Sequence, residues 1–101
     1  MAIIKNLEDI NTGALMTYHV ISSVSTDKLS KVTVLTVTSF ATKLAYDSVP
    51  KKSSVATEHI VLKSDIPENV EMWSWAYLQI TDSRLTLLHG ITDKFTNGTF
   101  I

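Results

Sequence analysis

Three histidines are the side chains in this chain best able to bind a metal ion or to act as a general base. His19, His59 and His89 lie 40 and 30 residues apart, whereas the common metal motifs place two ligands close together on one element. Glu58 is next to His59, but adjacent residues of a strand point to opposite faces of a sheet. The spacing therefore predicts ordinary strand or surface histidines and no metal centre.

Hydroxyl side chains are the next candidates for chemistry. Serine and threonine supply 24 of the 101 residues. With so many hydroxyl groups, a Ser, a His and an Asp can come together by chance, so a catalytic triad is indicated only where a known local motif surrounds the serine. No serine lies in a Gly-x-Ser-x-Gly elbow, and Gly13, Gly90 and Gly98 are too scattered for a phosphate-binding loop. Cysteine is absent, which excludes disulfides, thiol catalysis and cysteine-rich metal sites. We expect no catalytic residue and no cofactor, and hence a protein that is not an enzyme.

Two tryptophans, Trp73 and Trp75, could act in recognition, since exposed indoles stack on sugar rings or fill pockets at interfaces. On a strand they would share a face, whereas on a helix they lie about 200° apart. We favour the helix, with one indole in the core and the other exposed or buried by a neighbouring subunit. Packing of both in the core is the structural alternative.

Composition limits the architecture and the partners. A chain of 101 residues with 45% hydrophobic and 19% charged residues is typical of one globular domain, residues 1–101. Its formal charge of -1 leaves no basic surplus for phosphates or anionic lipids. No apolar run approaches the roughly 20 residues that cross a bilayer. We therefore expect neither nucleic acid nor a membrane as a partner.

The strand signals come from β-branched residues, because Val, Ile and Thr supply 31 positions. Strand signals occur over 16–24, 32–40 and 55–63, and the polar stretch 26–31 makes a hairpin of the first two runs. Run 32–40 has apolar residues of both parities and is expected to be covered on both faces. Residues 41–54 are polar, and within them 47–54 are expected to form an exposed, mobile loop.

The remaining elements complete the predicted fold. Ser64 or Asp65 could cap a helix over about residues 67–80, with Pro67 in its first turn. After Ile80, either a short helix from Asp82 to Gly90 or a strand over 85–88 fits. The tail, about 90–101, carries Asn97-Gly98 and suits a closing hairpin or a docking arm. The fold class is thus α+β, mainly β: an antiparallel sheet of about four strands with one helix packed on a face.

A family resemblance rests on four pieces: the opening Met1-Ala2-Ile3-Ile4-Lys5-Asn6, the Gly13 turn followed by Tyr18-His19-Val20, the long strand ending at Phe40, and Trp75-Ala76-Tyr77-Leu78. Over roughly residues 1–80 the chain resembles small uncharacterised proteins encoded among the structural genes of tailed bacteriophages. The Trp73/Trp75 pair and the tail after Ile80 depart from that pattern. The resemblance implies a virion or tail-assembly component that is used in several copies and has no chemistry of its own.

These observations lead to one functional hypothesis and one alternative. We expect a non-enzymatic structural protein of the virion, present in the host cytoplasm during assembly, whose partners are further copies of itself and other virion proteins. The alternative is a small carbohydrate- or ligand-binding domain using Trp73 or Trp75, although a small-molecule ligand is not expected. The interface residues predicted from the sequence are Trp73, Trp75, Phe95, Phe100 and Ile101.

Overall fold

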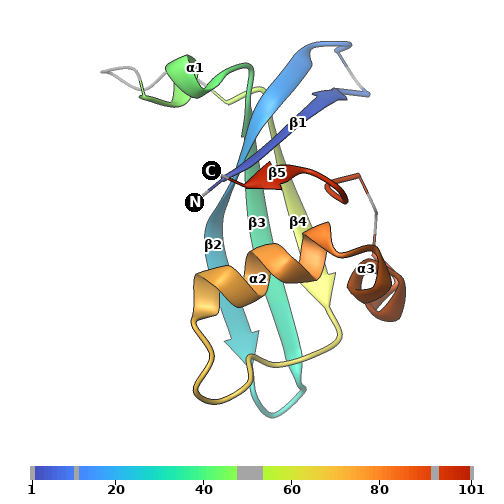
Figure 1. Cartoon of the computed structure of the whole chain (residues 1–101). Coiled ribbons are helices and arrows are strands. Elements are labelled where there is room, and N and C mark those ends of the chain that lie inside the picture. Colours follow the sequence, from blue (N-terminus) through green and yellow to red (C-terminus); the bar gives the residue numbers. More distant parts are fainter. Residues whose placement is uncertain (1, 11, 48–53, 92–93, 101) are drawn as a thin grey trace.

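A computed structural model describes residues 2–10, 12–47, 54–91 and 94–100 of the chain (Figure 1). These residues form a twisted antiparallel sheet with one helix lying across it and two shorter helices at its margins. The elements in chain order are β1 (Ile3–Glu8), β2 (Leu15–Asp27), β3 (Val32–Phe40), α1 (Lys43–Asp47), β4 (Ala56–Leu62), α2 (Met72–Thr81), α3 (Ser83–His89) and β5 (Thr99–Phe100).

The sheet has five strands in the order β4-β3-β2-β1-β5. Each neighbouring pair is antiparallel, so the predicted α+β, mainly β class is confirmed. The expected count of about four strands was one too few, because neither β1 nor β5 carries a clear alternation. β1 shifts register between Ile4 and Leu7 in its pairing with β2, and such an irregularity breaks the period of two. Strand β5 has only two residues.

The hydrophobic core lies between one face of the sheet and α2. The sheet contributes the alternate positions Leu35 and Val37 of β3, which sit opposite Ile60 of β4 and Ile21 of β2. Successive side chains of a strand point to opposite faces, so these residues share the face that α2 covers. The helix contributes Trp75, Ala76, Tyr77 and Ile80, and the tail contributes Phe95.

The opposite face of the sheet is only partly covered, which corrects the expectation that β3 is buried on both sides. Tyr46 of α1 packs against the rings of Tyr18 and Phe40, with centroids 5.1 and 5.2 Å away. Beyond that end the face carries hydroxyl side chains, and the Ser22 and Thr38 hydroxyls bond each other at 2.9 Å. The helix α1 precedes the expected loop 47–54, most of which, residues 48–53, lies outside the described residues.

The main helix begins later than predicted. Its N-cap is Glu71, whose carboxylate accepts the backbone N–H groups of Trp73 and Ser74, and not Ser64 or Asp65. The reason lies at Asn69, whose φ of 63° is left-handed and incompatible with a helix running on from Pro67. The helix ends at Thr81, within a residue of the predicted end.

After Ile80 the chain forms a helix and not a strand. Asp82 closes α2 with its backbone N–H and caps α3 with its carboxylate, which accepts the N–H of Arg84. Gly90 ends α3 in the left-handed conformation, at φ 67°. The tail then returns to the sheet, where Phe95 enters the core and Phe100 of β5 pairs with Ile3 of β1.

Candidate functional site

The residues expected at an interface do not form one surface. Trp75 and Phe95 are 9% and 1% exposed and belong to the core, so neither is on the surface of the described chain. Trp73 and Phe100 are 38% and 45% exposed. They flank the same side chain, because Phe100 stacks edge-on against Tyr77 and Trp73 lines a hollow with Tyr77. Ile101 lies outside the described residues.

The two indoles separate as expected for a helix. Trp75 points into the core and Trp73 stays at the surface, so the prediction of one buried and one exposed tryptophan is confirmed. A flat platform of two indoles, the arrangement that would favour sugar binding, is therefore not present. The carbohydrate-binding alternative retains a single exposed ring as its basis.

The feature that sequence reasoning missed is an open edge on β2. Strand β1 pairs with β2 only from Leu15 to His19, whereas the pairing with β3 continues to Asp27. The backbone N–H of Ile21 is bonded by the Tyr77 hydroxyl at 2.9 Å. Among the described residues, those from Ser22 to Asp27 have no strand on the side away from β3. We call residues 22–27 the open β2 edge.

This edge is regular and uncharged over most of its length. The register of β2 shifts between Ile21 and Ser23, and from Ser23 to Asp27 each residue then has its own partner on β3. Residues 22–26 are Ser, Ser, Val, Ser and Thr. Protein edges are usually protected by Lys, Pro, a bulge or a covering loop. Within residues 23–26 the chain has none of the first three.

Apolar side chains border the open β2 edge. A hollow of about 340 Å³ beside it is lined by Val20, Ile21, Trp73 and Tyr77. Figure 1 shows the N-terminal end of α2 at the β2 side of the sheet. At that end the side chains of Val70, Met72 and Trp73 are all exposed. An extended segment along the edge would therefore find both backbone groups and an apolar surface.

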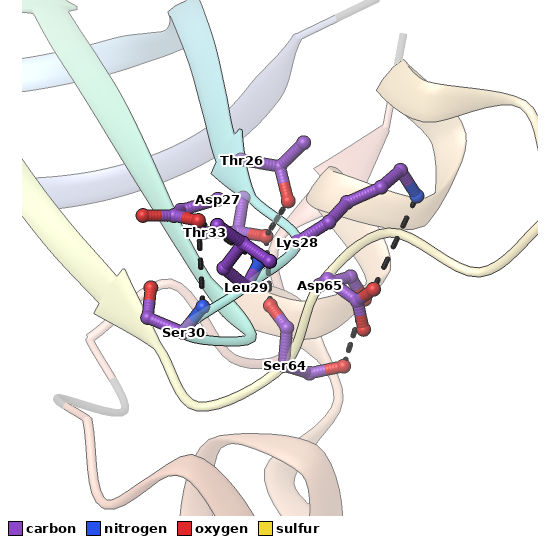
Figure 2. Close-up of polar contacts among 8 residues, drawn as sticks. All are labelled: Thr26, Asp27, Lys28, Leu29, Ser30, Thr33, Ser64 and Asp65. Carbon is purple, nitrogen blue, oxygen red and sulfur yellow. Dashed lines mark hydrogen bonds and ion pairs between the residues drawn. The ribbon is translucent and has the colours of Figure 1, made fainter.

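Polar contacts fix the far end of the edge (Figure 2). In the β2–β3 turn the Asp27 carboxylate accepts the backbone N–H groups of Leu29 and Ser30, and these bonds lower its pKa. Lys28 reaches Asp65 at 4.0 Å, and the Thr33 hydroxyl donates to the Ser64 carbonyl at 2.7 Å. The hairpin is thus tied to the segment that leads into α2, so the edge and the helix end are held together.

The opposite edge of the sheet, β4, is flanked by other parts of the chain. Glu58 is ion-paired with Lys94 of the tail. The backbone N–H of Lys63 donates to His89 Nδ1 at 3.1 Å, which brings the C-terminal end of α3 beside the strand. This edge carries charges near both of its ends, unlike the open β2 edge.

The histidines do not gather. Among the residues that the structure describes, no three His, Cys, Asp or Glu side chains meet in a group able to hold a metal ion. His59 bonds Thr36 on the hydroxyl-bearing face of the sheet, while His19 and His89 are buried. His89 Nε2 bonds Gln79 Oε1 at 2.8 Å, and burial lowers the pKa of His89.

His19 and Ser39 form a buried hydrogen-bonded pair that resembles the base and nucleophile of a hydrolase. His19 Nε2 lies 2.8 Å from the carbonyl oxygen of Lys5, so this nitrogen carries the proton. His19 Nδ1 then accepts from the Ser39 hydroxyl at 2.8 Å, as a general base accepts from a nucleophile. Burial lowers the pKa of His19 and keeps the imidazole neutral.

The position of this pair favours a structural role. His19 and Ser39 are directly opposite each other on β2 and β3, and Ser39 is only 5% exposed. Ser39 is one of the residues that line a cleft of about 660 Å³, with Leu7, Met16 and Phe95 among the others. The Ser39 hydroxyl is directed at His19 Nδ1, so its proton is already used in a hydrogen bond between the two strands. The pair therefore satisfies buried polar groups between two strands.

Comparison with known protein families, with curated proteins and with solved structures finds no match to this chain. Among the described residues, no helix is long and apolar enough to cross a membrane. Functional inference therefore depends on the geometry of the chain itself.

Proposed function

We propose that this protein is a non-catalytic structural component that acts through protein–protein contacts in an assembly containing several copies of it. The observation that carries the proposal is the open β2 edge, with exposed apolar side chains of α2 beside it. A strand edge presents unpaired N–H and C=O groups that bind another extended chain. The resemblance to structural-gene products of tailed phages supplies the setting, a virion or tail assembly.

The amount of exposed apolar surface also supports an assembly role. Twelve large hydrophobic residues of the described chain are exposed. Single exposed residues are normal, but clusters of them mark interaction sites. Leu87 and Leu88 are adjacent on α3 and form such a cluster away from the β2 edge. Other proteins of the assembly could use this second surface.

The proposal is tested first by oligomeric state. The purified full chain is examined by size-exclusion chromatography with light scattering over a hundredfold range of concentration. We expect the mass to rise with concentration to a defined oligomer. A strict monomer throughout, with no partner recovered from cells that express the neighbouring genes, would refute the assembly role.

The setting is tested by the genes that flank this one. Portal, capsid, neck or tail genes on either side are expected. A gene set without any virion component would contradict the phage setting, while leaving the measured oligomeric state to decide the assembly role.

A further inference from the structure

We propose that the open β2 edge pairs with the open β2 edge of a second copy, antiparallel and about a two-fold axis, to give one continuous ten-stranded sheet. This inference rests on the proposed function and names the first contact of the assembly. The surface is made by residues 22–27 of β2 together with Val70, Met72 and Trp73 at the N-terminal end of α2.

The chemistry of the edge decides what kind of partner fits. Tyr77 already bonds the N–H of Ile21, which is the residue just before the edge. Beyond the irregularity at Ser22, the backbone from Ser23 to Asp27 continues as a regular extended strand paired with β3. Only another extended backbone presents donors and acceptors at the matching spacing. The occupant is therefore a strand.

The side chains show why that strand can come from a second copy. Antiparallel self-pairing centred on Val24 sets Ser23 opposite Ser25 of the other copy, and Thr26 then lies beside Ser22, where the register of β2 shifts. The ladder between the copies ends before Ile21, whose N–H is already bonded by Tyr77, and the Asp27 carboxylate is occupied by the turn N–H groups of Leu29 and Ser30. No like charges meet, which is the usual obstacle to self-pairing of an edge.

Symmetry then brings the exposed helix ends together. A two-fold axis between antiparallel strands of one sheet is perpendicular to the sheet, so both copies carry α2 on the same side. In each copy the N-terminal end of α2 lies at the β2 side of the sheet (Figure 1). The exposed Val70, Met72 and Trp73 of the two copies are thus placed on either side of the axis. The contact would combine a backbone ladder with apolar burial.

The absence of cysteine makes a direct test available. Each residue from Ser22 to Thr26 is replaced singly by cysteine, and each full-length variant is oxidised mildly and examined on a non-reducing gel. A disulfide requires Cα atoms about 4.4–6.8 Å apart, which only residues at the two-fold axis meet. We expect a sharp maximum of cross-linked dimer at one or two positions. The matched control, Thr57→Cys, places an exposed cysteine on β4 and should give no such product.

A charge swap gives an independent readout. Ser25→Lys and Ser25→Glu each change an exposed residue, so the fold should persist and is checked by circular dichroism. Each variant alone should dissociate at least tenfold more readily than the unmodified chain. An equimolar mixture of the two should recover the dimer, which a merely destabilised fold would not do.

The outcomes separate the two proposals. An oligomer whose cross-linking is strong at Thr57→Cys and absent along Ser22–Thr26 would overturn the β2 contact while leaving the assembly role intact. A chain that stays monomeric in every light-scattering experiment would remove both. Unchanged dimerisation in both Ser25 variants would also overturn the β2 contact.

Discussion

The Tyr77 hydroxyl accepts the backbone N–H of Ile21 at 2.9 Å, which joins α2 to β2 just before the strand loses its second neighbour. Burial raises the pKa of Tyr77, so the hydroxyl stays protonated at neutral pH. Without Tyr77, the backbone N–H of Ile21 would be buried with no hydrogen-bond acceptor. The bond thus sets where the open β2 edge begins.

Removal of this hydroxyl should be costly. Tyr77→Phe leaves the buried N–H of Ile21 without its acceptor, and we expect a loss of about 1–3 kcal/mol in the free energy of unfolding. Urea denaturation followed by circular dichroism measures it. The matched control is Tyr18→Phe, because the Tyr18 hydroxyl makes no hydrogen bond among the described residues. Equal stability losses in the two variants would contradict the role of Tyr77.

Acid should weaken the fold first through its two buried histidines. His19 and His89 have pKa values lowered by burial from the usual 6.5, so the folded state holds them neutral while the unfolded chain protonates them. The unfolded state then binds more protons, and stability falls as pH drops below about 6.5. For His19 the slope reaches at most about 1.4 kcal/mol per pH unit.

The measurement is the urea midpoint at a series of pH values between 8 and 5. Near pH 8 histidine is almost entirely deprotonated in both states, so the slope fades there and serves as the internal control. His19→Gln should flatten the slope between 6.5 and 5 relative to the unmodified chain. A midpoint that rises on acidification through this window would show that the sign is wrong.

Asp82 serves two helices at once, and its loss should disturb both. Its Oδ1 accepts the N–H of Arg84 at 2.9 Å, and its backbone N–H donates to the Leu78 carbonyl at 3.1 Å. Asp82→Ala removes the cap of α3 and should lower the urea midpoint, whereas Asp82→Asn retains an acceptor and should lower it less. Arg84→Ala is the control, since its ion pair with Asp82 is largely exposed and should matter little. An equal effect of all three variants would exclude the capping role.

The close approach of the tail to β1 depends on Gly98. A Cβ at this position would overlap the Ile3 side chain and lie 3.2 Å from the Phe95 carbonyl oxygen. Gly98→Ala should therefore cost about 1–3 kcal/mol and loosen β5, seen as faster amide exchange at Phe100. Thr99→Ala, at an exposed neighbouring position, should leave both unchanged. Normal protection of Phe100 in Gly98→Ala would show that the tail tolerates a side chain there.

The elements that could be predicted are those whose signals are local. Residues 32–40 are rich in β-branched side chains, six of the nine being Val or Thr, and β3 spans the same range. The sequence offers Asp82 and Gly90 as the N-terminal and C-terminal caps of a short helix, and they are the caps of α3. The start of α2 could not be found in this way. Ser64 and Asp65 are as suitable for an N-cap as Glu71, and only the left-handed backbone of Asn69 makes the helix begin at Met72.

By itself, the sequence determined the mainly-β class, the positions of the strands from 16 to 63, and the absence of thiol chemistry. These follow from side-chain type and short-range periodicity. Tertiary structure decided that Phe95 is buried in the core while Trp73 is exposed, and that His19 is hydrogen-bonded to Ser39. It also decided that the pairing of β2 with β1 ends at His19. Those outcomes depend on register and on contacts between residues far apart in the chain. Pairing energies of that kind are spread over whole strands, and no single stretch of residues encodes them.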